Sequence, residues 1–301
     1  MGATGALLRG FGMGAALSAY ARPALLALAS AAAASLLALG LYATTPRARQ
    51  GIGGIVASTL WWSLADRLGV KGSFPYRSDQ LTAATLDACL RKGGTLTDPD
   101  TSVVGFERAS FGEGGGFLGE MERLELQVEG PAAATTPRVM VAKFGPRDFQ
   151  ARILTRLMQA LSTEAAIYQH GSVSASGVRA PRCYFAGNEP LADRVLVLME
   201  DLAPLATADQ AAGLTEREAC SAVREIAKLH AKYWGRCKKE CPFVPTVDSM
   251  KHIDLKGFMK PNLERAFTLA RTIIHKHGLP AETLDDATVE GFRACPDQFK
   301  R

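Results

Sequence analysis

Apolar and polar residues alternate along the middle of the chain, and this alternation predicts β-strands. The pattern is clearest over residues 120–129, where Met121, Leu124, Leu126 and Val128 are apolar and the residues between them are polar. A strand with one buried face shows this period of two. Weaker strand patterns cover residues 102–111, 138–144, 182–186 and 194–199, the last two around an expected turn at Gly187–Asn188.

A period close to four predicts helices next to these strands. Residues 149–170 place Ile153, Leu157, Leu161 and Ala165 on one face, so we expect a single amphipathic helix there. Residues 81–91 read as a shorter helix with Thr82 as its N-cap.

The chain is helical in pattern after residue 203. Thr215 and Glu218 have the spacing of a capping box, which opens a helix whose residues His230, Tyr233 and Trp234 are expected in the core of a helical unit. Residues 263–277 form another amphipathic pattern. The order of elements therefore predicts an α+β protein with two lobes: a small lobe with an antiparallel sheet, then a helical lobe that is incomplete.

The first 65 residues differ in composition from the rest. Residues 24–43 carry no charge, and about 20 apolar residues suffice to cross a bilayer as a helix. The same arginine-rich, acid-free composition also fits a transit peptide for a mitochondrion or plastid, and a buried alanine-rich helix is a third interpretation. Residues 52–70, with Trp61 and Trp62, suit either a membrane surface or a helix packed on the following domain.

Charge and cysteine content exclude several functional classes. The formal net charge is +5, but four of the 35 basic residues precede Asp66, the first acidic residue, which leaves 31 basic residues against 30 acidic ones. A nearly neutral globular part gives no electrostatic reason to expect nucleic-acid binding. The six cysteines are scattered as reduced intracellular thiols would be, and Cys237 and Cys241 lack a second ligand pair at zinc-finger spacing.

A glycine-rich run, a lysine and a glutamate follow one another in an order that suggests phosphate binding. Lys143 ends the predicted strand 138–144, where a cation can neutralise phosphates, and Glu164 in the following helix can orient that lysine. Glycines allow backbone N–H groups to approach phosphates closely, because they have no Cβ. The glycines concerned lie between two predicted strands and are Gly112, Gly114, Gly115, Gly116 and Gly119.

A predicted linker between the lobes completes this candidate site. The apolar strand 194–199 runs into Glu200, Asp201 and Leu202, where backbone groups would contact an adenine ring beside Met199. Each feature alone is common, since glycine runs are usually turns and a lysine at a strand end is usually solvated. Their order along the chain favours a site for ATP.

Several short motifs resemble the aminoglycoside phosphotransferase and choline kinase superfamily, and in particular its ecdysteroid-kinase-like (CHK-kinase-like) branch. The resemblance covers about residues 74–240 and implies a protein-kinase-like two-lobe fold that uses ATP and magnesium to phosphorylate a hydroxyl group of a small molecule. The residues that carry it are Leu81-Thr82, the run 111–119, Arg123-Leu-Glu-Leu126, Val141-Ala-Lys143, Glu164 with Tyr168, Pro181-Arg-Cys-Tyr184, Leu198-Met-Glu-Asp-Leu202 and Leu229-His-Ala-Lys-Tyr-Trp234.

The sequence departs from this family where catalysis should occur. The family's catalytic loop is a His-x-Asp followed five residues later by Asn, and a second Asp binds the metal. The only His-x-Asp here ends at Asp254, and Met259 stands where the Asn belongs. The sequence therefore predicts no catalytic residue and no metal ligand.

The sequence predicts three segments and leaves three interpretations of the function open. We expect a membrane-anchor or targeting segment at 1–65, a kinase-like N-terminal lobe with a preceding helix at 66–203, and a truncated helical C-terminal lobe at 204–301. The chain is then an inactive kinase-like protein, a non-enzymatic nucleotide-binding or interaction module, or a fragment of a longer active kinase. Its expected partners are a nucleotide, a hydroxylated small molecule if the complete protein is active, and a membrane.

Overall fold

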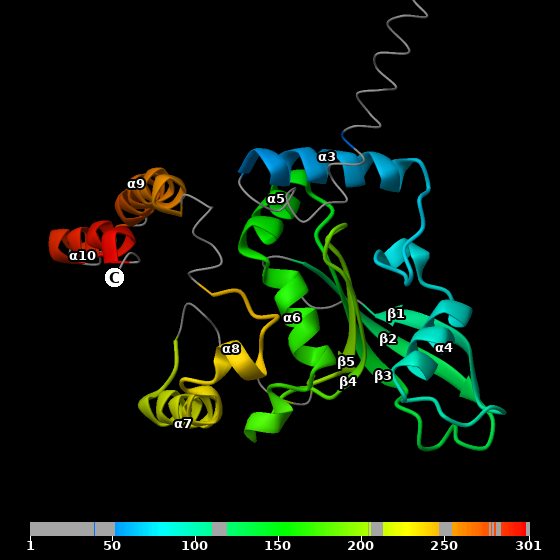
Figure 1. Ribbon diagram of the computed structural model, residues 1–301. Helices are drawn as coiled ribbons and strands as arrows, with labels where there is room; N and C mark the ends of the chain where they lie inside the picture. The colour runs from blue at the N-terminus through cyan, green and yellow to red at the C-terminus, as the bar shows by residue number, and fades with distance from the viewer. Residues whose placement is uncertain are drawn as a thin grey trace, which may run out of the picture.

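A five-stranded antiparallel sheet forms the centre of the molecule (Figure 1). The structure is a computed structural model that describes residues 39, 52–109, 119–203, 205, 213–246, 255–276, 278, 280 and 284–298. Strands lie in the order β1-β2-β3-β5-β4, and the α+β class expected from the sequence is confirmed. Their bounds are β1 Ser102–Ala109, β2 Glu120–Glu129, β3 Val139–Phe144, β4 Cys183–Glu189 and β5 Arg194–Glu200.

The two faces of the sheet are covered by different helices, α4 (Ala83–Lys92) and α6 (Ala160–Gln169), as Figure 1 shows. Alternate residues of β3 supply the two cores, because successive side chains of a strand point to opposite faces. Met140, Ala142 and Phe144 pack in the larger core with side chains of α4. Val141 packs in the second core with side chains of α6. Lys143 therefore belongs to the α6 face.

The helix expected over residues 149–170 is two helices, α5 (Phe149–Met158) and α6. Gln159 between them has a φ of 51°, a left-handed conformation that interrupts the helical hydrogen bonds. Each half packs on a different partner, α5 on α3 (Ile52–Arg67) and α6 on the sheet. The apolar period runs through the break, so the sequence gives no sign of it.

Helix α3 packs on the lobe, although the sequence placed a segment boundary after residue 65. Ile55 contacts Leu157 of α5 in a small apolar core. The hydroxyl of Ser58 accepts a hydrogen bond of 2.7 Å from Arg156. Ser63 accepts one of 3.0 Å from Arg152. Contacts made by small serine side chains leave no clear sequence pattern, and they join residues 52–65 to the lobe.

The remainder of the expected N-terminal segment lies outside the described residues, apart from Leu39. Its interpretation as a membrane anchor or targeting peptide stays a prediction. Among the helices that the structure describes, none is both long and apolar enough to span a membrane.

The turn between β4 and β5 lies later than the sequence predicted. Strand β4 continues through Gly187 to Glu189, and the chain turns at residues 190–193, where Asp193 has a φ of 54°. Gly187 serves packing instead, because a Cβ there would lie 2.7 Å from the ring of Phe74. A glycine marks a close approach as readily as a turn.

Glu189 ties this turn to the segment that precedes α4. Its carboxylate accepts a hydrogen bond of 2.7 Å from the backbone N–H of Ser73 and lies 3.3 Å from the guanidinium of Arg194. Burial alone would raise the pKa of Glu189, but the hydrogen bonds from Ser73 and Arg194 outweigh it and leave the pKa below its ordinary value.

The C-terminal part consists of helices α7 (Glu216–Tyr233), α8 (Cys237–Glu240), α9 (Leu255–Lys276) and α10 (Asp286–Gln298). Thr215 and Glu218 form the predicted capping box of α7. Helix α9 begins earlier than residue 263 and contains Pro261. In Figure 1, α9 and α10 lie side by side, away from the sheet.

The prediction that His230, Tyr233 and Trp234 are core residues is wrong. Trp234 is 79% exposed, His230 is exposed and Tyr233 is half-buried, its hydroxyl donating to the carbonyl of Ser172 at 2.6 Å. The apolar period correctly marks one face of α7. It carries no information about what covers that face, and none of the residues of α7 is buried.

Candidate functional site

Lys143 and Glu164 form an ion pair on the α6 face of the sheet. The Nζ atom of Lys143 lies 2.8 Å from each oxygen of the Glu164 carboxylate. The side chains are 22% and 33% exposed, so both reach solvent. The ion pair predicted from the sequence is confirmed. Its function as a nucleotide site stays a prediction.

Rigid elements hold both members of this pair. Lys143 stands in the sheet between Met121 of β2 and Val197 of β5, its partners in register. Glu164 lies on α6 beside Leu161 and Ala165, which are buried against the sheet. The cation is thus fixed by the sheet and the carboxylate by a packed helix, which is how a site is preorganised.

Gly119, the last glycine of the glycine-rich run, lies next to Lys143. A Cβ placed on Gly119 would be 2.6 Å from the backbone carbonyl oxygen of Phe144 and 3.8 Å from Cε of Lys143. No real Cβ approaches a backbone oxygen that closely, so this position requires glycine. Four other glycines assigned to the site lie outside the described residues: Gly112, Gly114, Gly115 and Gly116.

The residues assigned to the adenine end lie where β5 leaves the sheet. Met199 pairs with Val141 of β3 and is buried, and the hydroxyl of Tyr168 lies 3.9 Å from its sulfur. Two hydrogen bonds join Glu200 to the backbone of Arg182. The Arg182 N–H donates to the Glu200 carboxylate at 3.0 Å, and the Arg182 carbonyl accepts from the Glu200 N–H at 2.8 Å. Leu202 follows and is half-buried.

An ion pair that the sequence analysis missed fixes the start of the linker. Nε of Arg123 on β2 lies 2.6 Å from the carboxylate of Asp201, whose side chain is only 8% exposed. The other oxygen of Asp201 accepts the backbone N–H of Ala203 at 2.9 Å. The two residues are 78 positions apart in sequence, so no local sequence pattern could have predicted this ion pair.

Two neutral side chains complete the surroundings of the ion pair. Burial raises the pKa of the Tyr168 hydroxyl, and the negative charge of Glu164 raises it further. Burial also raises the pKa of the Cys183 thiol to about 11. Both groups therefore stay protonated near neutral pH and add no charge to the site.

The described residues offer no metal centre of their own. In the part of the chain that the structure covers, no three His, Cys, Asp or Glu side chains gather closely enough to hold a metal ion. Asp254, the end of the isolated His-x-Asp motif, lies outside that part.

A comparison with family models, with curated proteins and with solved structures found no match to this chain. The resemblance to small-molecule kinases therefore rests on the sequence motifs quoted above.

Proposed function

We propose that the sheet and α6 bind a nucleoside triphosphate, with its phosphates at Lys143 and its adenine beside residues 199–202. The observation that supports this most is the Lys143–Glu164 pair, in which a strand cation is oriented by a helix carboxylate and remains open to solvent. Kinases use such a lysine to neutralise the α- and β-phosphates. The chain is then a kinase-like protein related to ATP-dependent small-molecule hydroxyl phosphotransferases.

The chemistry of the described residues fits a triphosphate. An ammonium group has three donors, and Glu164 occupies only part of this capacity, so Lys143 can also donate to a phosphate oxygen. Gly119 lies within reach of Lys143 and presents no side chain there. Phosphates bind where backbone N–H groups and a cation come together.

Phosphoryl transfer requires more than nucleotide binding, because it needs a base and bound magnesium in addition to a nucleotide site. The 301 residues contain no His-x-Asp followed five residues later by Asn. Glu164 is committed to Lys143, and Asp201 is committed to Arg123. We therefore expect nucleotide binding without phosphotransfer from this chain.

The alternative is a non-enzymatic interaction module built on the same lobe. It is favoured by the apolar residues that α7 leaves exposed, among them Val223, Ile226 and Trp234. The two functions differ in one measurable respect, since only the first requires saturable nucleotide binding that depends on Lys143.

One experiment tests both parts of the proposal. The purified full chain is titrated with ATP by calorimetry. It is then incubated with magnesium, labelled ATP and a panel of choline, ethanolamine, aminoglycosides and steroid alcohols. We expect saturable binding and no labelled product. Absence of binding would overturn the nucleotide site, and product that disappears in Lys143→Met would show that the chain carries its own catalytic base.

A further inference from the structure

A cavity lies at the end of the sheet opposite the linker. Its volume is about 680 Å³, within the range of about 300–1,000 Å³ that small-molecule sites occupy. The ends of β3 and β5 that line it are those near Phe144 and Leu196, whereas the linker leaves from the other end of β5, where Glu200 pairs with Met140. Helix α3 and the start of α5 form its walls. None of the described residues assigned to the nucleotide site, such as Lys143 and Glu164, is among those that line this cavity.

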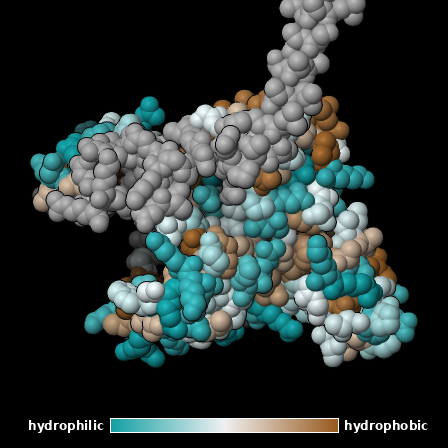
Figure 2. Space-filling view, viewed as in Figure 1, coloured by the Kyte–Doolittle hydropathy of each residue, from teal (hydrophilic) through white to brown (hydrophobic). Residues whose placement is uncertain are grey.

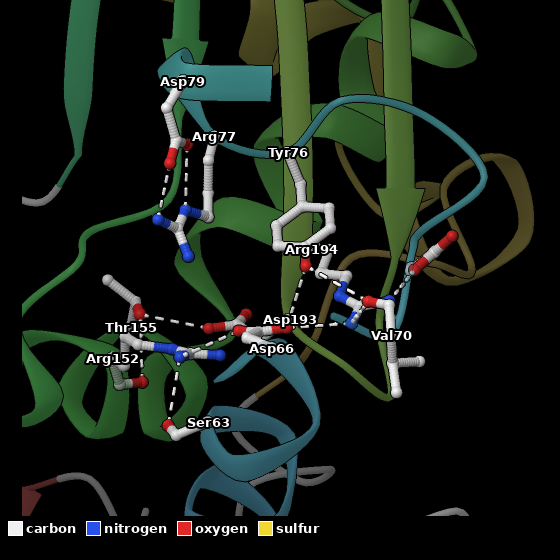
Figure 3. Close-up of polar contacts among 11 residues, drawn as sticks. Ser63, Asp66, Val70, Tyr76, Arg77, Asp79, Arg152, Thr155, Asp193 and Arg194 are labelled. Carbon is white, nitrogen blue, oxygen red and sulfur yellow. Dashed lines mark hydrogen bonds and ion pairs between the residues drawn. The ribbon is translucent and has the colours of Figure 1, made fainter. Parts of the chain in front are cut away.

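The two carboxylates of the cavity's polar floor accept hydrogen bonds from protein groups (Figure 3). Asp66 accepts hydrogen bonds from Tyr76 at 3.0 Å and from Arg194 at 2.8 Å, and it lies 3.3 Å from Arg152. Asp193 accepts from the hydroxyl of Thr155 at 3.4 Å. Five arginines but only these two aspartates line the cavity, so its formal charge is positive.

Arg194 is the buried cation of the floor. It is 3% exposed and lies over the ring of Tyr76 at 4.2 Å and that of Trp62 at 5.2 Å. Burial alone would lower its pKa, but the hydrogen bonds that Arg194 donates to Asp66 and Glu189, together with the negative charge of Asp66, outweigh burial and leave the pKa raised, so the guanidinium stays charged. Its Nε has no hydrogen-bond partner among the residues that the structure describes. A buried donor in this state favours an incoming acceptor.

Three arginines at the rim are available to an anion. Within the described part of the chain, Arg67 makes no ion pair. Arg77 pairs with Asp79, and Arg147 pairs with Glu120, but all four of these side chains are at least one-third exposed. Exposed ion pairs of this kind contribute little to stability, so exchanging either carboxylate for a ligand anion costs little.

The walls of the cavity are apolar. Leu60 is 51% exposed and Phe149 is 37% exposed, and Trp61 and Leu64 also line the cavity. Leu39, the one described residue of the uncharged stretch 24–43, also lines the cavity. Figure 2 shows hydrophobic surface along α3 next to hydrophilic side chains. Apolar walls below a cationic rim match a molecule with an apolar chain and an anionic head.

We propose that this cavity binds an anionic amphiphile, with its phosphate or carboxylate head at Arg67, Arg77 and Arg147 and its apolar chain against α3. Trp61 gives the site its own reporter, because indole fluorescence changes when an apolar chain replaces water beside the ring. A phospholipid in a bilayer and a dissolved amphiphile share this chemistry.

The test titrates the full chain with octyl phosphate below its critical micellar concentration, and with octanol and inorganic phosphate separately, while tryptophan fluorescence is recorded. We expect saturable binding of octyl phosphate, much weaker binding of octanol, and none of inorganic phosphate. Trp61→Phe should remove the signal, and Trp234→Phe, on distant α7, should keep it. Arg67→Ala combined with Arg147→Ala should raise the Kd about tenfold or more, because each removes a charge-assisted contact, whereas Arg217→Ala on α7 should not.

Vesicles distinguish the two sources of the ligand. Co-sedimentation is measured with phosphatidylcholine vesicles, with and without phosphatidic acid. Uptake of dissolved octyl phosphate that needs the rim arginines identifies a free amphiphile. Co-sedimentation that needs phosphatidic acid and the rim arginines, without uptake of octyl phosphate, identifies a bilayer lipid. Binding that the arginine variants leave unchanged, or no binding in either arm, would overturn the proposal.

Discussion

Replacing Lys143 by Met separates the nucleotide-binding function of this residue from its contribution to the fold. Met keeps an apolar stem of similar length in the sheet, so packing beside Met121 and Val197 is largely preserved. The Lys143–Glu164 pair is partly exposed, and pairs of this kind contribute no more than about 1 kcal/mol to stability. We therefore expect a small change in the free energy of unfolding.

Nucleotide affinity should respond far more strongly. A hydrogen bond between a charged donor and a phosphate contributes about 1.5–3 kcal/mol, and about 1.4 kcal/mol corresponds to a factor of ten in Kd. Lys143→Met should therefore raise the Kd for ATP roughly 10–100-fold in a calorimetric titration. Lys228→Met is the matched control, because Lys228 also pairs with a glutamate at 2.6 Å but lies on the exposed surface of α7.

Glu164→Gln extends this test to the orienting carboxylate. If Glu164 acts by holding Lys143, the double variant should bind ATP about as weakly as Lys143→Met alone, because effects of residues in one network are not additive. An unchanged Kd in Lys143→Met, with the variant folded, would refute the reasoning. An equal loss in Lys228→Met would show a general effect of charge.

Three further predictions concern stability and reactivity. Gly93→Ala should lower the free energy of unfolding, measured in urea, by about 3 kcal/mol, because the new Cβ would lie 1.8 Å from the carbonyl oxygen of Tyr184. Gly291→Ala is the control and should be neutral or stabilising, because the space around Gly291 is open. The pKa of Glu189 is lower in the folded than in the unfolded protein. Its contribution to stability is therefore present above the ordinary pKa of 4.5 and is lost as the pH falls through the lowered pKa of the folded state. Glu189→Gln should therefore lose less stability on acidification than the unmodified chain, and equal losses would contradict this. The thiol of Cys183 should react slowly with iodoacetamide at neutral pH and faster as the pH rises towards about 11, and rapid labelling at neutral pH, read by mass spectrometry, would contradict its burial.

Much of the sheet could be predicted because strands with one buried face carry their own signal. The predicted strand at residues 120–129 coincides with β2, and Thr82 and Thr215 cap the helices that their local patterns indicated. The break at Gln159 and the exposed position of Trp234 could not be predicted. Both depend on which partner a helix face meets, and a helical period does not contain that information.

The candidate site also has one part that the sequence predicted and another part that it did not. The pairing of Lys143 with Glu164 followed from a strand and a helix in consecutive order, and the structure brings the two side chains together. The Arg123–Asp201 pair and the arginine-lined cavity under α3 join residues far apart in sequence. Contacts of this kind depend on the arrangement of whole elements in space, so they emerge only when the fold is known.

The Arg123–Asp201 pair also decides where this chain can tolerate a change of length. An insertion within β5 would slip its register by one residue and turn each side chain beyond it to the opposite face of the sheet. Met199 would then leave the core that it shares with α6. After Asp201 the chain has already been fastened to β2, so a residue added there would leave the register of β5 intact. Variation in linker length among natural or engineered forms of this chain should accordingly be confined to positions beyond Asp201.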